Sequence, residues 1–211
     1  MSQQWERTAT KPSQMTPYTG PVLPLTEEDW DFFLSVYELT AQTAMRYIRR
    51  AVEPRYILPI YAPNGDIRGH VAREGWPGSP IRAARPSAYK KALTYMCMPN
   101  APVQSFYYIP DCRPLVLVED QLSAIKLAAS GYNAVALLGV PNDGSIGVDR
   151  VREISKLPCS EVIIALEADT TENAFQFVRK YGMAFKKIRV AILEKDIKDT
   201  KKACFQEVLG I

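Results

Sequence analysis

Two acidic residues directly follow a short apolar run near the end of the chain. The run covers residues 162–166 and leads into Glu167 and Asp169, which are two positions apart. On a strand this spacing places both side chains on one face, because successive side chains alternate between the two faces. Two like charges on one face repel each other unless water screens them or a cation lies between them. The spacing therefore leaves two interpretations open, a solvated strand end or a metal site.

Two other apolar runs are followed by acids in the same way. Ligand sites in parallel α/β sheets form where strands end, so three such ends would bring their oxygens to one edge. Carboxylate oxygens suit Mg²⁺ and Mn²⁺, and His70 is the only histidine, which excludes a histidine cage. Together the three strand ends favour a metal site. The additional acids are Glu119, Asp120, Glu194, Asp196 and Asp199.

The composition excludes several classes of protein. With 211 residues, 47% of them hydrophobic, the chain can bury the core of one large or two small domains. A net charge of +3 is too small to argue nucleic-acid binding by itself. No signal-peptide pattern and no apolar run of membrane-spanning length is present, so we expect a soluble cytoplasmic protein without a membrane partner. The scattered cysteines, without a CxxC pair, argue against a structural zinc site or a disulfide framework; they are Cys97, Cys112, Cys159 and Cys204.

The first quarter of the chain contains a predicted arm and a predicted helix. Residues 1–25 are rich in Pro, Thr, Ser and Gln, which is typical of a flexible or wrapped arm. Thr26 with Asp29 three residues later has the spacing of a capping box, which predicts a helix beginning there. Because apolar residues then recur at helical spacing, we expect one helix that ends near Arg50, before Pro54. The periodic positions are Trp30, Phe33, Leu34, Tyr37 and Ala41.

The remaining sequence predicts a hairpin followed by alternating strands and helices. Asn64-Gly65 joins two alternating runs and is typical of a tight β-hairpin. The stretch SAYKKALTYM, residues 87–96, indicates a basic helix. After Pro114, strand-like and helix-like segments alternate to the end, which predicts a parallel sheet with helices on both faces. We therefore predict an α/β protein with a smaller mixed α+β subdomain, residues 26–113, before a sheet domain, residues 114–211.

Positive charge is concentrated before the predicted sheet domain. Residues 44–91 contain ten basic and three acidic residues, whereas the C-terminal half is close to neutral. A basic patch beside a carboxylate site is typical of proteins that bind nucleotides or nucleic acid. The alternative is a solvated face whose arginines are paired elsewhere.

The order of motifs in the C-terminal half matches a known family. LVLVEDQLSAIKLAASGYNAVALLG combines a strand that ends in a glutamate, a helix and a glycine turn, and VIIALEADTTENAFQFVRKYG contains the two spaced acids. With the tail IRVAILEKDIKDTKKA, this order resembles a Toprim domain, the metal-binding module of primases, topoisomerases and some nucleases. The resemblance implies Mg²⁺ or Mn²⁺ as cofactor, Glu119 nearest the chemistry as a metal ligand or general base, and Glu167 and Asp169 as metal ligands. Asp196 or Asp199 would support a second ion.

The hairpin also carries part of this resemblance. YAPNGDIRGHVAR looks like the hairpin that precedes Toprim in phage primase-helicases, where basic residues face nucleotide and template. The likeness implies that basic residues of the hairpin, of the segment after it and of the C-terminal tail bind nucleic acid or nucleotide. These residues are Arg68, Arg73, Lys90, Lys91, Lys195 and Lys198.

The sequence departs from the family at two motifs. Primases usually carry Glu-Gly-Glu-x-Asp, whereas this chain has EDQLS from Glu119 to Ser123. Glu167 replaces the usual first aspartate of the Asp-x-Asp motif. No zinc ribbon precedes the sheet domain in this sequence, and no GxxxxGK[ST] loop follows it.

The resemblance implies a DNA primase, a Mg²⁺-dependent nucleotidyltransferase that makes short RNA primers on single-stranded DNA from nucleoside triphosphates. Its setting would be phage-type replication in a bacterial cytoplasm, with a separately encoded helicase. A metal-dependent nuclease on the same fold is one alternative, and a catalytically inactive protein that binds nucleic acid or a replication partner is the other. Metal-dependent turnover distinguishes the two enzymes from the binding protein.

Overall fold

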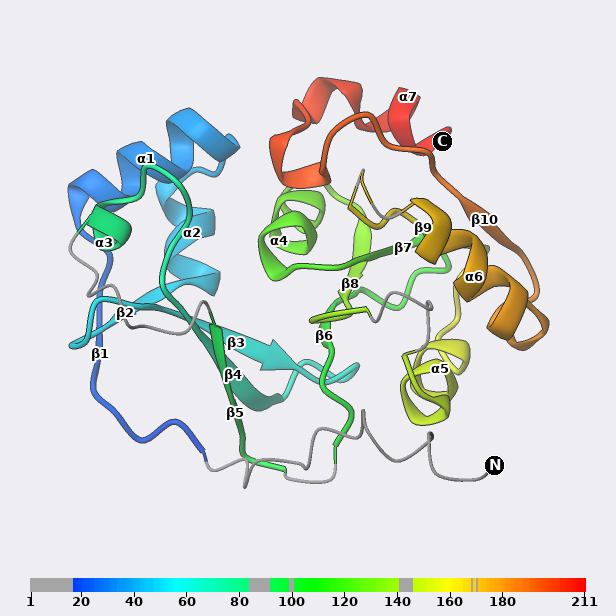
Figure 1. Ribbon diagram of the computed structural model, residues 1–211, viewed down its shortest axis with the longest axis horizontal. Coiled ribbons are helices and arrows are strands. Elements are labelled where there is room, and N and C mark those ends of the chain that lie inside the picture. Colours follow the sequence, from blue (N-terminus) through cyan, green and yellow to red (C-terminus); the bar gives the residue numbers. More distant parts are fainter. Residues whose placement is uncertain (1–16, 84–91, 99–100, 141–145, 168, 170) are drawn as a thin grey trace, which may run out of the picture.

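The computed structural model describes residues 17–83, 92–98, 101–140, 146–167, 169 and 171–211. These residues form two five-stranded sheets (Figure 1). The first is antiparallel, in the order β1 (Val22–Leu23), β2 (Arg49–Ala51), β3 (Tyr56–Tyr61), β4 (Ile67–Arg73), β5 (Ala92–Met96). The second has the order β10 (Ile188–Val190), β9 (Val162–Ile164), β7 (Leu115–Val118), β8 (Asn133–Ala136), β6 (Ser105–Tyr107).

Helices cover both faces of the second sheet, as predicted. On one face, sheet residues such as Val116 and Ile163 share a core with α4 (Gln121–Ala129) and α7 (Phe205–Leu209). On the other face, residues such as Leu117 and Ile164 pack with α5 (Val148–Ser155) and α6 (Thr171–Tyr181). The alternation of side chains along each strand explains why neighbouring residues enter different cores. Short 3-10 helices also occur in the described part of this half, among them η2 (Gly182–Ala184), η3 (Ile197–Asp199) and η4 (Lys202–Cys204).

The second sheet is mixed, although its central strands are parallel. Strands β10, β9, β7 and β8 pair in parallel, but β6 pairs antiparallel with β8. Strand β6 precedes position 113 in the sequence and nevertheless belongs to the second sheet. The predicted domain boundary between residues 113 and 114 therefore stays a prediction. The predicted α/β fold class, with its parallel strands, is confirmed.

The predicted capping box opens α1 (Glu27–Tyr37), but the helix does not continue to Arg50. The Thr26 backbone N–H donates to the Asp29 carboxylate at 2.9 Å, and the Asp29 N–H donates to the Thr26 hydroxyl at 3.4 Å. Glu38 then adopts the left-handed conformation, with φ 57°, and Thr40 caps a second helix, α2 (Ala41–Tyr47). The single predicted helix is wrong because a left-handed residue followed by a new N-cap redirects the chain into β2.

The predicted hairpin is confirmed, whereas residues 92–96, the described part of the predicted basic helix, form a strand instead. Strands β3 and β4 pair around a turn that includes Gly65, whose φ of 88° favours glycine. The described part of the stretch 87–96 is strand β5, because the free edge of β4 pairs with it from Gly69 to Arg73. Pairing with a neighbouring strand overrides the helical preference of Ala, Leu and Met. One more helix, α3 (Pro80–Ala83), lies between β4 and β5.

Only the last part of the predicted arm is described. Within residues 17–25, Val22 and Leu23 form strand β1 at the edge of the first sheet, paired with Ala51 and Arg50. This segment therefore wraps onto the protein. Among the described helices, none is long and apolar enough to cross a membrane.

Candidate functional site

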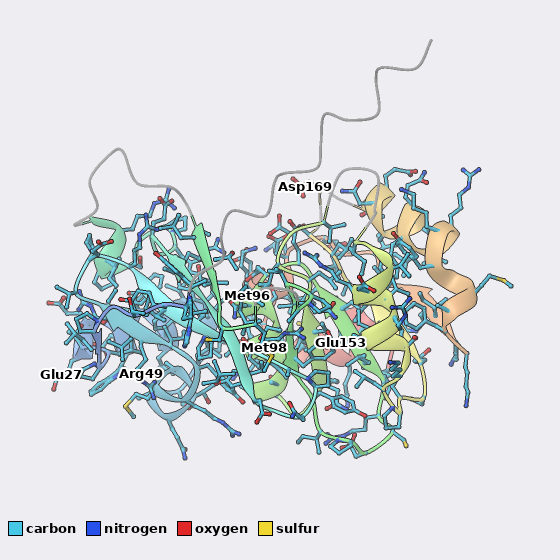
Figure 2. The ribbon with its side chains drawn as sticks, turned by 90° about the horizontal axis from the view of Figure 1, so that it is seen from below. Glu27, Arg49, Met96, Met98, Glu153 and Asp169 are labelled. Carbon is cyan, nitrogen blue, oxygen red and sulfur yellow. The ribbon has the colours of Figure 1, made fainter. Side chains whose placement is uncertain are left out.

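The sheet brings the predicted acidic strand ends to one edge. Strands β10, β9 and β7 are neighbours and run parallel, so their carboxyl ends meet on the same side of the sheet. Glu119 follows β7, Glu167 follows β9 and Asp196 follows β10. Asp169 is exposed at the same edge and is labelled in Figure 2. This is the place where parallel sheets commonly bind ligands.

Glu119 lies in an environment with excess negative charge. Burial raises the pKa of Glu119 to about 7, and the neighbouring carboxylates of Glu167, Asp120 and Asp169 add to the rise, against one backbone hydrogen bond from Val140. Half-buried like charges near one another disfavour ionisation unless a cation neutralises them. Glu119, Glu167 and Asp169 are therefore close enough together for their charges to interact.

Asp120 has a structural role as well as a charge. Its Oδ1 accepts hydrogen bonds from the backbone N–H groups of Leu122 at 2.8 Å and Ser123 at 3.2 Å, and its Oδ2 accepts one from the Ser123 hydroxyl at 2.7 Å. Asp120 is thus the N-cap of α4. The cap fixes the chain between β7 and α4 and so positions Glu119, the preceding residue.

Lys198 lies among acids that come from three strand ends. Its Nζ is 3.7 Å from Asp120 Oδ2 and 3.5 Å from Glu167 Oε1, and it also forms an ion pair with Asp196. Burial alone would lower the pKa of Lys198, but these three carboxylates raise it above its ordinary value. Lys198, predicted to bind nucleotide, therefore neutralises part of the negative charge at this edge of the sheet. We call this edge the acidic edge; its acids are Glu119, Asp120, Glu167, Asp169 and Asp196.

The other predicted tail residues lie in different surroundings. Asp199, in η3, and Lys195 are exposed. Asp199 contributes to the pKa of Tyr37, which burial raises to about 12. Asp196 is partly buried and paired with Lys198. The two candidates for a second metal ligand, Asp196 and Asp199, are thus not equivalent.

A cleft of about 190 Å³ separates the acidic edge from the first sheet. Glu119, Glu167 and the start of α4 line it on one side, and strand residues of β3, β4 and β5 line it on the other. On the latter side the Arg73 guanidinium stacks on Trp76, with 5.0 Å from its central carbon to the ring centroid. Arg73 Nε and Trp76 Nε1 are buried and lack a hydrogen-bond partner within the described residues. Arg73 therefore lines the cleft opposite the acids, and its role in nucleotide binding stays a prediction.

Arg68, by contrast, is not placed to bind a ligand. Its side chain is only 2% exposed, and its guanidinium donates to both Glu153 carboxylate oxygens at 2.8 and 3.0 Å and to the Gln104 carbonyl at 2.6 Å. Figure 2 shows Glu153 on the side of the C-terminal half that faces the first sheet. Arg68 thus joins the hairpin to α5, which corrects its predicted role in nucleic-acid binding.

The remaining predicted basic residues, Lys90 and Lys91, lie outside the described residues. Trp76, conversely, is not among the predicted site residues. A large aromatic residue in the segment EGWPGS, directly after the last arginine of the hairpin, is the sequence signal that points to it.

The donor chemistry of the edge suits a hard cation. In the ranges described above, no group of three His, Cys, Asp or Glu side chains is already arranged to hold a metal ion. The oxygen donors Glu119, Glu167 and Asp169 nevertheless match the preference of Mg²⁺ and Mn²⁺. Burial raises the pKa of Glu119 most, and a bound divalent cation would relieve the repulsion between carboxylates that adds to the rise. The residues present therefore fit such an ion.

Comparison with known proteins identifies the fold. No protein-family model and no curated protein matches the sequence. The structure is similar to the zinc-binding and RNA polymerase domains of the Aquifex aeolicus primase, with a TM-score of 0.59 and 15% identity over 90% of this chain and 50% of that chain. It is equally similar to the primase fragment of the bacteriophage T7 primase-helicase, with a TM-score of 0.59 and 14% identity over 93% of this chain and 77% of that chain.

A third similar structure is the DnaG primase catalytic domain bound to single-stranded DNA, with a TM-score of 0.53 and 17% identity over 86% of this chain and 62% of that chain. The present chain spans half the length of the Aquifex chain that it matches. At these identities the comparisons show the fold. The chain has the fold of primase catalytic domains, and the expected resemblance is confirmed at that level.

Proposed function

We propose that the chain is a primase-type nucleotidyltransferase that joins ribonucleotides on a single-stranded DNA template. One observation carries the proposal: on a primase fold, the half-buried Glu119 carboxylate and the Arg73–Trp76 pair face each other across one cleft. Nucleotidyl transfer requires a positive group for the triphosphate and an acidic edge for a metal ion, and the cleft offers both.

Each residue has a proposed part in the reaction. Arg73 holds phosphate oxygens of the incoming nucleoside triphosphate, because its partly exposed side chain lines the cleft opposite the acids. Glu119 either binds the metal or accepts the proton of the primer hydroxyl, for which a pKa near neutrality is suitable. Glu167 and Asp169 would hold Mg²⁺ or Mn²⁺ with it. The ion would neutralise charge on the transferring phosphate and acidify the attacking hydroxyl.

The proposed partners follow from the same reaction. They are single-stranded DNA, nucleoside triphosphates and, for replication of phage type in a bacterial cytoplasm, a separately encoded helicase. Basic side chains around the cleft would make DNA affinity fall as salt rises, because phosphate binding releases counterions.

A catalytically inactive nucleic-acid-binding protein is the second candidate. The observation that favours it is the Lys198 ammonium, which already pairs with acids at the edge where an ion would bind. Such a protein would bind DNA without a divalent cation and would show no metal-dependent turnover.

The decisive experiment is primer synthesis on single-stranded DNA with labelled nucleoside triphosphates and Mg²⁺ or Mn²⁺. We expect short RNA products from the wild type, loss of these products in Glu119→Gln, and full synthesis by Glu207→Gln, which alters an exposed glutamate on α7. Glu119-dependent loss of the template strand would instead identify a nuclease. An intact template without products would contradict stand-alone primase activity and favour the binding protein.

A further inference from the structure

Lys198 is an unusual lysine because its charged group is enclosed by acids. Its side chain is 14% exposed, while those of its partners Asp120, Glu167 and Asp196 are 10%, 35% and 23% exposed. All three partners come from the carboxyl ends of adjacent parallel strands. An ion pair of a fully solvated surface lysine contributes little to stability. Lys198 instead lies where three strand ends converge.

A second lysine holds the backbone of Lys198 in place. The Nζ of Lys126, on α4, donates to the Lys198 carbonyl at 3.0 Å and to the Thr200 carbonyl at 2.7 Å. Lys126 is 2% exposed, and its ammonium also lies 3.5 Å from Glu38 Oε2. The Glu38 carboxylate accepts the backbone N–H of Lys202 at 2.8 Å. The segment that carries Lys198 is thus held by Lys126 of α4 and by Glu38 at the α1–α2 junction.

The acidic edge is therefore divided into two parts of different charge balance. Asp196, Asp120 and Glu167 are within ion-pair distance of the Lys198 ammonium. Glu119 has no such pair among the described residues, and the carboxylates of Glu167, Asp120 and Asp169 repel its charge, so Glu167 borders both parts. Polymerases and nucleases commonly use two metal ions 3.5–4 Å apart, each held by carboxylates. Here a protein cation already lies on one part of the edge.

We infer that the Lys198 ammonium occupies the position of a second divalent cation, so that the edge binds one ion, at Glu119, Glu167 and Asp169. The metal part of this inference rests on the function proposed above. Lys198 acts as a positioning residue: it holds Asp120, Glu167 and Asp196 together without a second metal. Asp196, expected from the sequence to support a second ion, is instead the partner of Lys198.

Counting bound Mn²⁺ tests the inference directly. The full-length chain is titrated with Mn²⁺, and the free ion is measured by its electron paramagnetic resonance signal. We expect one bound ion in the wild type and two in Lys198→Met, because the freed acids then need a cation. Lys201→Met, which alters an exposed lysine without an ion pair among the described residues, should keep one.

The possible counts have distinct meanings. Two ions on the wild type, or one ion on both the wild type and Lys198→Met, would overturn the inference and leave the proposed function standing. No bound Mn²⁺ on either protein would overturn the inference together with the metal-dependent reaction. Glu119→Gln should weaken the single wild-type ion at least tenfold, which places that ion on the proposed acids.

Thermal unfolding provides a second readout if Lys198→Met is poorly folded. Without metal, the variant should unfold at a lower temperature than the wild type, because three carboxylates lose their shared cation, and Mn²⁺ should raise its unfolding temperature more than that of the wild type. Lys198→Arg keeps a cation and should still bind one ion. Two ions on Lys198→Arg, or an equal Mn²⁺-induced shift in Lys198→Met and the wild type, would contradict the inference.

Discussion

Arg68 and Arg73 lie on the same strand, β4, and have opposite surroundings. Arg68 is buried at the contact with α5, and Glu153 and the Gln104 carbonyl bind its guanidinium. Arg73 is at the far end of the strand, where its partly exposed side chain lines the cleft and its guanidinium stacks on Trp76. An arginine that is buried and paired within the protein contributes to folding, and one that is partly exposed in a cleft can bind a ligand. The comparison therefore separates a structural arginine from a candidate binding residue.

Replacing the buried arginine, Arg68, should have the largest effect, and this effect is on folding stability. Arg68→Ala leaves Glu153 and the Gln104 carbonyl without their buried partner, so we expect the free energy of unfolding to fall by about 3 kcal/mol. Chemical denaturation measures this loss. Arg82→Ala is the matched control, since Arg82 is exposed and should change the free energy of unfolding by less than about 0.5 kcal/mol. Equal stability of the two variants would mean that Arg68 does not join the two halves.

The second effect is on nucleotide affinity. Arg73→Ala should weaken the binding of a nucleoside triphosphate roughly tenfold or more, because a charge-assisted hydrogen bond to phosphate contributes about 1.5–3 kcal/mol. Its free energy of unfolding should fall by less than in Arg68→Ala. Isothermal titration calorimetry with Mg²⁺ measures the affinity, again with Arg82→Ala as control. An unchanged dissociation constant would remove Arg73 from the proposed nucleotide site.

A smaller effect concerns the stability contributed by the acidic edge. The folded-state pKa of Glu119 is raised to about 7, above its unfolded value, so its stabilising contribution is present below pH 4.5 and is lost as the pH rises through 7. Without metal, Glu119→Gln should therefore be more stable than the wild type above pH 7, by about 1–2 kcal/mol for this half-exposed group, and equally stable below pH 4.5.

Thermal melts in EDTA across this pH range test the sign of the effect. Saturating Mg²⁺ at pH 8 should reduce or reverse the difference, because only the wild type keeps all its metal ligands. A Glu119→Gln variant that is less stable than the wild type above pH 7 without metal would show that the carboxylate is already neutralised.

The sequence predicts the parts of this site whose signals are local. A carboxylate directly after a strand, such as Glu119 or Glu167, is recognisable because strand ends and the β-α alternation are visible in adjacent residues. The Thr26 capping box and the hairpin around Gly65 are local in the same sense and are confirmed. These signals were sufficient for the fold class and for the edge at which the acids meet.

The remaining features depend on partners that are distant in the sequence. Arg68 and Arg73 look alike in the hairpin, and the glutamate that binds Arg68 lies 85 residues later. Strand β5 forms in the described part of a segment that was expected to be helical, since the free edge of β4 pairs with it. Lys198 meets Asp120 only because β7, β9 and β10 are adjacent in the sheet. Such contacts are fixed by tertiary packing, which residue spacing does not encode.

The central claim is that the cleft between Arg73–Trp76 and the acidic edge binds a nucleoside triphosphate with a metal ion. Quenching of Trp76 fluorescence tests it most directly, in a chain whose Trp5 and Trp30 are replaced by Phe so that Trp76 alone emits. We predict that a nucleoside triphosphate quenches Trp76 in a Mg²⁺-dependent way, and that both Arg73→Ala and Glu119→Gln weaken this response. Quenching that needs neither Mg²⁺ nor these two side chains, or no quenching at saturating nucleotide, would contradict the account.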